Sequence, residues 1–452
     1  MDFIRVFENQ KIFKHNSYIN AIMEAVYWKE IGEEIGRLKV KKESVRYRIA
    51  PFVQWKVLIA ENDVQVKSGL PAIIKIRDVE VPENTILAPL SIMRHALGTT
   101  IDVIEKGISR VEHEKKITHA VFLPVEDGIV EKGDIIGVLK IFFVKTGMID
   151  RIFGFSPSDI KLREDMVSAN LVYRENGELK RKKIKTRFFG YFKSYIGEWE
   201  PIVSAENIEV KRGEVRRIKI REIHLQPNTV VTPLHIMRNA FGSTIEVVQC
   251  KPSKVEEEKL LTEAIFLATK TGKIEKGDLL GVLNVYYTSI GKFEPKMGPK
   301  EEKFARFVYE KSGRIFRNGM LLKPFAYRRK PISRWEPLVS NEDLSLKRGE
   351  VAEIEIKPVR LEENTIVYPL YIMRHAYGTV IDLVEKEPAK VESPKTIRKV
   401  LFMPVFDGEV KKGQLLGVIN VYNVEIEPYE VLSKWLSEWV EEMKRALGEG
   451  SE

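Results

Sequence analysis

The sequence predicts a mainly β protein made of three tandem small antiparallel β domains, which we expect to be β-clip or barrel-like. Three blocks of the 452-residue chain align without a gap, at residues 47–144, 191–288 and 327–424. Trp55, Trp199 and Trp335 fix their register. Runs such as AIIKIRDVEV, RRIKIREIHL and AEIEIKPVRL alternate apolar and polar residues with the period of a half-buried strand. A repeat of this length sets the architecture before any motif is interpreted.

The segments outside the blocks follow in chain order. Residues 1–46 are predicted to be helical, because Ile19, Ile22, Met23 and Val26 recur at helix spacing. A stripe of Leu, Trp, Val and Met predicts an amphipathic helix over residues 429–447, which docks either on the domains or on a partner. Copies 2 and 3 carry a leading hairpin and are joined by helical or hairpin linkers. The predicted domains are 1–46 (helical segment), 47–144 (repeat 1), 145–171 (linker), 172–288 (hairpin and repeat 2), 289–307 (linker), 308–424 (hairpin and repeat 3) and 425–452 (C-terminal helix).

Identity among the copies is densest in NTILAPLSIMRHALGTTI, NTVVTPLHIMRNAFGSTI and NTIVYPLYIMRHAYGTVI. Proline suits the first position of a short helix and glycine its C′ position, so we expect a helix between Pro89 and Gly98 and in the other copies. The arginine of this stretch has two interpretations: a structural pair with a repeat-wide glutamate, or a contact to an anion. The arginines are Arg94, Arg238 and Arg374, and the glutamates are Glu112, Glu256 and Glu392.

This stretch and the closing phrases KGDIIGV, KGDLLGV and KGQLLGV resemble the archaeal family catalogued as domain of unknown function 22. The resemblance covers all three blocks. It implies an archaeal cytoplasmic protein and brings no known activity. The closing phrase alone is similar to strands of trimeric dUTPase-like β-clip folds and of biotinyl-type sandwiches. The dUTPase likeness would make the copies a pseudo-trimer within one chain; a homo-oligomer is the alternative.

Copy 2 lacks polar residues that copies 1 and 3 share. His95 and His375 become Asn239, Asp127 and Asp407 become Thr271, and Lys106 and Lys386 become Cys250. Copies 2 and 3 are otherwise the closer pair, so this agreement of copies 1 and 3 indicates a shared constraint. A histidine held by an aspartate acts as an acid or base near neutral pH, and with an arginine it binds an anion. The same residues equally suit a pseudo-threefold interface. The candidate ligand-binding residues are Arg94, His95, Lys106, Asp127, Arg374, His375, Lys386 and Asp407, with the repeat-wide Arg238.

Composition leaves three classes of function open. The formal charge is +9, and a single cysteine fits a reducing cytoplasm. We expect no membrane partner, no cofactor and no metal, because no motif for them occurs. The leading hypothesis is a β scaffold that binds an anionic small molecule, a phosphate-bearing ligand or a partner through repeats 1 and 3. The alternatives are a small-molecule or nucleotide-acting hydrolase using His, Asp and Arg, and an RNA- or ribosome-associated protein using residues 180–183 and 328–330.

Overall fold

The computed structural model describes residues 22–42, 44–90, 94–105, 107, 111–147, 155, 165–175, 177–188, 190–234, 237–249, 253–289, 297, 302–322, 325–370, 373–385 and 391–447. These residues form thirty strands and one helix, and the strand pairs are antiparallel. The predicted mainly β architecture of repeated antiparallel domains is therefore confirmed.

The three longest strands join the repeats into one closed unit. They are β3 (Val45–Ile59), β13 (Gly190–Val203) and β23 (Phe325–Val339). Each pairs with one of the others through its first half and with the remaining one through its second half. This cyclic pairing relates the three repeats by a common pseudo-threefold axis.

A nine-stranded sheet is built on these three strands. The closing phrase of each repeat forms the next strand, namely β10 (Ile135–Lys145), β20 (Leu279–Thr288) and β30 (Leu415–Glu425). These strands are buried along nearly their whole length, which explains why they are rich in Val, Leu and Ile without alternation. The outer strands are β6 (Thr85–Leu90), β16 (Thr229–Leu234) and β26 (Thr365–Leu370).

Each repeat adds a three-stranded and a two-stranded sheet. The three-stranded sheets are β5 (Ala72–Val81), β8 (Lys115–Pro124) and β7 (Gly98–Glu105); β15 (Val215–Leu225), β18 (Lys259–Ala268) and β17 (Gly242–Gln249); and β25 (Ala352–Leu361), β28 (Lys395–Pro404) and β27 (Gly378–Glu385). The two-stranded sheets are β4 (Val64–Val66) with β9 (Gly128–Val130), β14 (Ile208–Val210) with β19 (Gly272–Ile274), and β24 (Leu344–Leu346) with β29 (Gly408–Val410). Equivalent side chains of β8, β18 and β28 pack in one apolar core shared by all three repeats, including Leu123, Leu267 and Met403.

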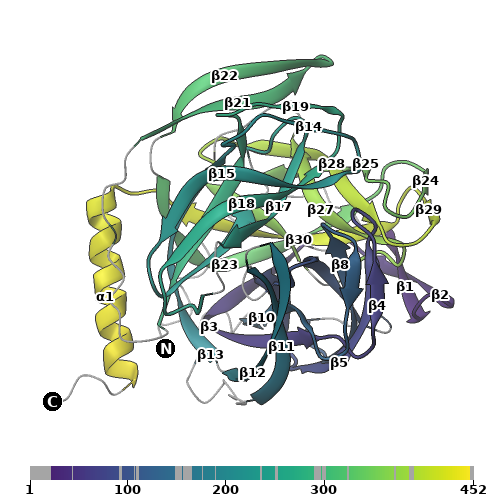
Figure 1. Cartoon of the computed structure of the whole chain (residues 1–452), viewed down its shortest axis with the longest axis horizontal. Coiled ribbons are helices and arrows are strands. Elements are labelled where there is room, and N and C mark those ends of the chain that lie inside the picture. The colour runs from purple at the N-terminus through teal and green to yellow at the C-terminus, as the bar shows by residue number, and fades with distance from the viewer. Residues whose placement is uncertain are drawn as a thin grey trace, which may run out of the picture.

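A hairpin precedes every repeat. These hairpins are β1 (Ile22–Glu30) with β2 (Glu34–Lys41), β11 (Asp165–Glu175) with β12 (Glu178–Phe188), and β21 (Lys303–Lys311) with β22 (Arg314–Leu322). Figure 1 shows all three at the periphery. The predicted helical N-terminal segment is wrong over residues 22–41. Met23, Ala25 and Val26 are all buried, so β1 is covered on both faces and its apolar residues do not alternate.

The short helix predicted from Pro89 to Gly98 is also wrong. Pro89, Pro233 and Pro369 lie within β6, β16 and β26, which are edge strands and tolerate a missing N–H. Gly98, Gly242 and Gly378 begin strands and do not have positive φ. A Cβ on Gly98 would stand 2.4 Å from the Leu123 carbonyl oxygen, so a close backbone approach requires glycine.

The helix predicted at the C-terminal end is confirmed as α1 (Tyr429–Leu447). Leu432 and Leu436 are fully buried and pack with Ile196 of β13 and Ala326 of β23. The helix thus docks on the outer face of the central sheet, as Figure 1 shows.

Candidate functional site

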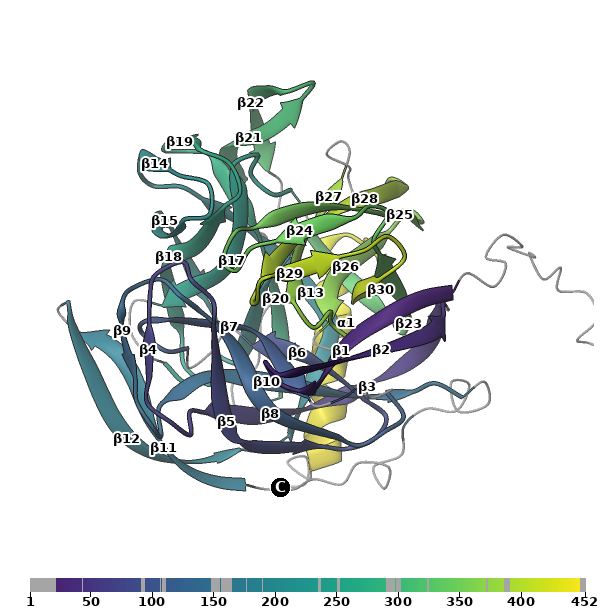
Figure 2. The ribbon, with the colours of Figure 1, turned by 90° about the vertical axis from the view of Figure 1, so that its right-hand side faces the viewer.

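Each hairpin docks on a repeat other than its own. The amides of Ala96, Ala240 and Ala376 donate to the carbonyls of Val172, Val308 and Val26, at 3.1, 2.9 and 2.8 Å. Hairpin β11–β12 therefore joins repeat 1, β21–β22 joins repeat 2, and β1–β2 closes the ring on repeat 3. Figure 2 shows β11–β12 beside β4 and β9, and β21–β22 beside β14 and β19.

His95 and Asp127, which change together in copy 2 and were expected to form one site, do not contact each other. His95 is fully buried, and its Nε2 lies 3.2 Å from Oδ2 of Asp134, the aspartate of the closing phrase. Its Nδ1 accepts the amide of Leu97 at 3.1 Å, so the imidazole is neutral with the proton on Nε2. Burial lowers the pKa of His95, which agrees with this tautomer.

Repeat 3 repeats this arrangement with a different partner. His375 Nδ1 accepts the Tyr377 amide at 3.3 Å, and Nε2 lies 3.2 Å from Oε1 of Gln414. Burial lowers the pKa of His375 to about 4. Both histidines therefore use both ring nitrogens to hold the fold.

Asn239 makes one equivalent contact and one different contact in repeat 2. Its Oδ1 accepts the Phe241 amide at 3.0 Å, as the histidine Nδ1 atoms do, but its Nδ2 donates to the Leu279 backbone carbonyl at 2.9 Å and not to a side chain of the closing phrase. The amide thus supplies one acceptor and one donor in place of the two imidazole nitrogens. Asn239, like the histidines, therefore uses both of its polar atoms within the fold.

Asp127 and Asp407 each accept a backbone amide at a turn. Asp127 Oδ1 accepts the Ser68 amide, and Asp407 Oδ1 accepts the Arg348 amide, both at 2.7 Å. In repeat 2, Thr271 Oγ1 accepts the Arg212 amide at 3.1 Å. These three turns meet in the axial depression, a hollow of about 480 Å³ lined by residues 68–70, 211–215 and 348–350.

The arginines face acids of neighbouring repeats rather than Glu112, Glu256 or Glu392. Arg374 Nε lies 4.0 Å from Oδ2 of the buried Asp102 in repeat 1. Glu246 of repeat 2 acts in the same way on Arg94 and accepts the Thr99 hydroxyl at 3.3 Å. Arg238 is the exception, because its Nη1 has no hydrogen-bond partner among the described residues. Two of the three arginines thus carry inter-repeat electrostatics.

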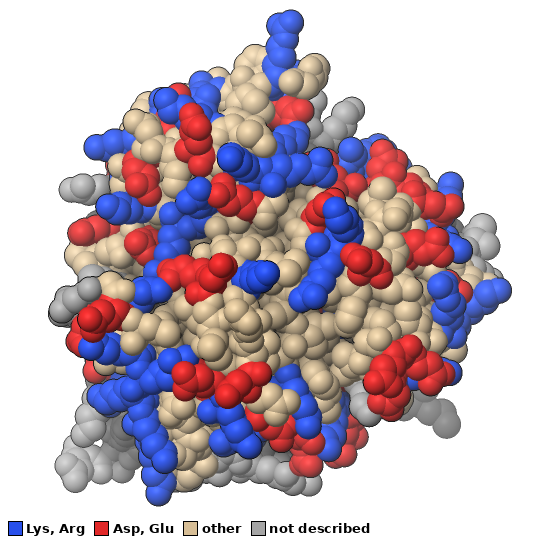
Figure 3. All heavy atoms as spheres, turned by 45° about the vertical axis from the view of Figure 1, so that its right-hand side comes forward, with Lys and Arg blue, Asp and Glu red and all other residues tan. Residues whose placement is uncertain are grey.

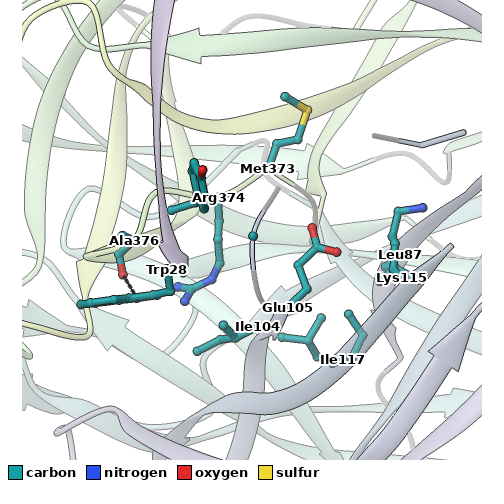
Figure 4. A pocket seen from close by; sticks show the side chains of 12 residues that line it. Trp28, Leu87, Ile104, Glu105, Lys115, Ile117, Met373, Arg374 and Ala376 are labelled. Carbon is teal, nitrogen blue, oxygen red and sulfur yellow. Dashed lines mark hydrogen bonds between the residues drawn. The ribbon is translucent and has the colours of Figure 1, made fainter. Parts of the chain in front are cut away.

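Arg374 also borders a small interior pocket. Figure 4 shows Arg374 and Glu105 directed into the space between Trp28 and Lys115. Its volume of about 30 Å³ suits roughly one water molecule. An organic ligand does not fit there. Lys106 and Lys386, the remaining predicted site residues, and Cys250 lie outside the described residues.

A different group of charges gathers where the long strands exchange partners. Lys193 and Arg329 occupy the equivalent point of β13 and β23, and repeat 1 has Ile49 there. The two cations are 8% and 6% exposed. Lys193 Nζ lies 3.2 Å from the centroid of the Tyr286 ring, and the Arg329 guanidinium lies 4.7 Å from that of Tyr422. Aromatic faces stabilise these charges only in part.

Lys140 of β10 completes what we call the axial cation cluster: Lys140, Lys193 and Arg329. It is 3% exposed, and its Nζ donates to Thr232 Oγ1 at 3.0 Å. Burial lowers the pKa of Lys140 to about 7, although Glu246 opposes this. Burial, together with Arg329 and Lys140, lowers the pKa of Lys193 well below its ordinary value. Each repeat thus contributes one buried cation.

Unused donors surround this cluster. Asn284 and Asn420, the equivalents of Lys140, accept the hydroxyls of Tyr327 and Tyr47 through Oδ1. Their Nδ2 groups and Arg329 Nε have no hydrogen-bond acceptor among the described residues. The hydroxyls of Tyr286 and Tyr368 lie beside Asn284 and Asn420, and these contacts oppose the rise in the tyrosine pKa values that burial causes. Buried donors are normally satisfied, so this gathering has the chemistry of an anion site.

The axial cation cluster was not among the residues predicted from the sequence. The prediction rested on residues absent from copy 2, whereas Lys193 and Arg329 are shared by copies 2 and 3, and Lys140 occurs in copy 1. The signal was a charge at a strand position that is apolar or amide in a sister copy: Ile49 against Lys193 and Arg329, and Lys140 against Asn284 and Asn420.

The two basic stretches do not form one surface. Lys182 and Lys183 are exposed on β12, but Arg329 is buried, and Arg328 pairs with Glu425 and stacks on Trp435. On the face in Figure 3, Lys and Arg are interspersed with Asp and Glu. Over the described residues, no helix is long and apolar enough to cross a membrane. In the same residues no group of three His, Cys, Asp or Glu is placed to hold a metal ion.

The fold and its docking sites define a class: one small β repeat, present three times and closed into a ring within a single chain. The sequence matches the family described as domain of unknown function DUF22 at residues 22–128, 168–272 and 304–408, and the chain belongs to this family. Each match begins with the leading hairpin. The uncharacterized protein MJ0614 of the archaeon Methanocaldococcus jannaschii is 30% identical over 90 residues, which cover 20% of this chain and 69% of that protein. No solved structure matches the chain.

Proposed function

We propose that the protein is a closed three-repeat scaffold that binds a small anionic ligand at the axial cation cluster. One observation carries the proposal: three repeats bury a cation each, and neither Lys193 nor Arg329 pairs with a carboxylate among the described residues. An unpaired charge in the interior costs several kcal/mol. A bound anion offsets that cost and takes the free donors of Arg329, Asn284 and Asn420.

The lysines make this binding proton-linked. Without an anion, Lys140 is about half neutral near pH 7, and burial shifts Lys193 in the same direction, because it lowers both pKa values. A negative ligand raises both pKa values, and the protein takes up protons as it binds. Affinity therefore increases as the pH falls from about 10 towards about 7, the pKa of Lys140 without an anion.

The proposal keeps the anionic ligand expected from the sequence and moves its site to the axis. His95 and His375 were the centre of the expected sites in repeats 1 and 3, but both use their ring nitrogens within the fold. A hydrolase would need one of these nitrogens free to move a proton, so the same contacts speak against that alternative.

Sister repeats supply matched variants for the test. Lys193→Ile installs the residue of repeat 1, and Lys140→Asn that of repeats 2 and 3. Thermal unfolding is followed with phosphate, sulfate, citrate or chloride at constant ionic strength. We expect at least one anion to stabilise the wild type, by about 2.7 kcal/mol at a hundred times its Kd, and to lose its effect in both variants.

Lys182→Asn, on the exposed face of β12, is the control and keeps the response. The proposal is overturned if no anion stabilises the wild type, or if Lys193→Ile responds as the wild type does.

A further inference from the structure

The three docking grooves share one backbone frame but differ in their side chains. The same main-chain hydrogen bond seats each hairpin, between an alanine amide and a valine carbonyl. An identical frame does not tell one hairpin from another. Two side-chain positions vary from groove to groove, and at each the two partners vary together.

At the first position the pairs are an aromatic pair and two ion pairs of opposite direction. Trp28 of β1 packs on Phe406 of repeat 3, with ring centroids 4.8 Å apart. Arg174 of β11 pairs with Glu126 of repeat 1. Glu310 of β21 pairs with Lys270 of repeat 2. Phe406, Glu126 and Lys270 occupy one equivalent position in the three repeats.

At the second position the groove contributes the last residue of the Lys-Gly-Asp phrase. Asn170 of β11 donates to Asp134 at 3.3 Å, and Arg306 of β21 pairs with Asp278 at 3.0 Å. In repeat 3 the groove residue is Gln414, whose Nε2 donates to Glu24 of β1 at 2.8 Å. The acid is on the groove in repeats 1 and 2 and on the hairpin at repeat 3.

We propose that these two positions form an address that assigns each hairpin to one groove and so fixes the order of the ring. Docking in the wrong groove places like charges together: Arg174 against Lys270, or Glu310 against Glu126. Hairpin β1–β2 is excluded from repeats 1 and 2, because Glu24 would face Asp134 or Asp278. Such repulsion between wrong partners gives specificity that attraction alone does not.

The assignment of hairpins to grooves also explains why the third residue of the closing phrase is Asp in repeat 1 and Gln in repeat 3. His95, Asp134 and Arg181 form one network under hairpin β11–β12, with Arg181 Nε 3.1 Å from Asp134 Oδ2. In repeat 3, His375 holds Gln414, which holds Glu24. The groove residue thus changes from Asp134 to Gln414 with the hairpin that it receives, while a histidine supports it in both repeats.

Exchanging the charged residues of two hairpins tests the proposal. Arg174→Glu with Glu310→Arg gives each hairpin the charge of the other while leaving the grooves unchanged. We expect Tm to fall by about 3 °C or more, because both ion pairs become like-charge contacts. Adding Glu126→Lys and Lys270→Glu restores both hairpin ion pairs and recovers part of the Tm; recovery is incomplete because the lysine at position 126 then also faces Arg217, which lies 3.2 Å from Glu126. If the fourfold variant is no more stable than the double variant, the pairs are not addresses.

A second exchange uses residues already present in the chain. Gln414→Asp restores the Asp of the sister repeats and is nevertheless expected to lower Tm, since Glu24 lies beside it. Glu24→Asn, which copies Asn170, is expected to recover most of the loss. An unchanged or higher Tm for Gln414→Asp alone contradicts the proposal. The anion response of the axial cation cluster serves as a check on folding in all these variants.

Discussion

The docking grooves and the axial cation cluster both differ among repeats, but in opposite ways. In the grooves, a changed residue meets a changed partner, as when Glu126 and Lys270 face Arg174 and Glu310. At the axis, Lys140, Lys193 and Arg329 are each a departure from a sister copy, and no carboxylate arises to pair with Lys193 or Arg329 among the described residues. A residue change that is matched by a change in its contact partner stabilises the fold. A buried charge without a partner of opposite charge favours a bound ligand.

The largest expected effect comes from weakening the contact through which hairpin β1–β2 closes the ring on repeat 3. Trp28→Ala removes a buried indole that packs on Phe406 and donates to the Ala376 carbonyl at 2.8 Å. We expect a loss of about 3–5 kcal/mol in the free energy of unfolding, measured in denaturant. Ile22→Ala, at an exposed position of the same strand, should cost far less. Equal losses would mean that β1 does not close the ring.

The equivalence of His95 and Asn239 is the next test. His95→Ala leaves the Leu97 amide without its side-chain acceptor and removes one of the donors to the buried Asp134, at an expected cost of about 2–4 kcal/mol. His95→Asn copies repeat 2 and should cost less than half as much. Denaturant unfolding of the two variants decides. If both lose the same stability, the difference between the copies is not explained by the fold.

The pH dependence of stability tests the axis. Burial lowers the pKa of Lys140 from 10.5 to about 7, so between these values the unfolded chain binds more protons than the folded one. Anion-free protein should therefore gain stability as the pH rises from about 7 to about 10, with Lys193 acting in the same direction. Lys140→Asn should be more stable at pH 7 by about 1–3 kcal/mol and show a shallower rise. If Lys140→Asn is less stable than the wild type at pH 7, burial of Lys140 does not destabilise the folded protein as proposed.

The smallest expected effect concerns the turns of the axial depression. Ala268 stands where repeats 1 and 3 have proline, and its amide donates to the Glu214 carbonyl at 2.9 Å. Ala268→Pro removes that donor and should cost about 1 kcal/mol. Pro404→Ala in repeat 3 is the reverse change. If Ala268→Pro loses much more than about 1 kcal/mol in the free energy of unfolding, the turn does more than form this one hydrogen bond.

Sequence reasoning reached the repeat, its strands and α1, because period and internal alignment are local signals. It failed at β1 and at Pro89, where burial on two faces and an edge position override local preference. It grouped His95 with Asp127 because both change in repeat 2. They change for separate reasons, one under a hairpin and the other at a turn. Lys193 and Arg329 meet only because β13 and β23 pair around the axis, which no spacing along the chain encodes.

Anomalous diffraction from crystals soaked in bromide tests the central claim most directly. Bromide replaces a small anion and is located by its own signal. We predict a peak within hydrogen-bond distance of Lys193 Nζ or the Arg329 guanidinium, which disappears in Lys193→Ile. Peaks confined to surface lysines, with none at the axial cation cluster, would contradict the account.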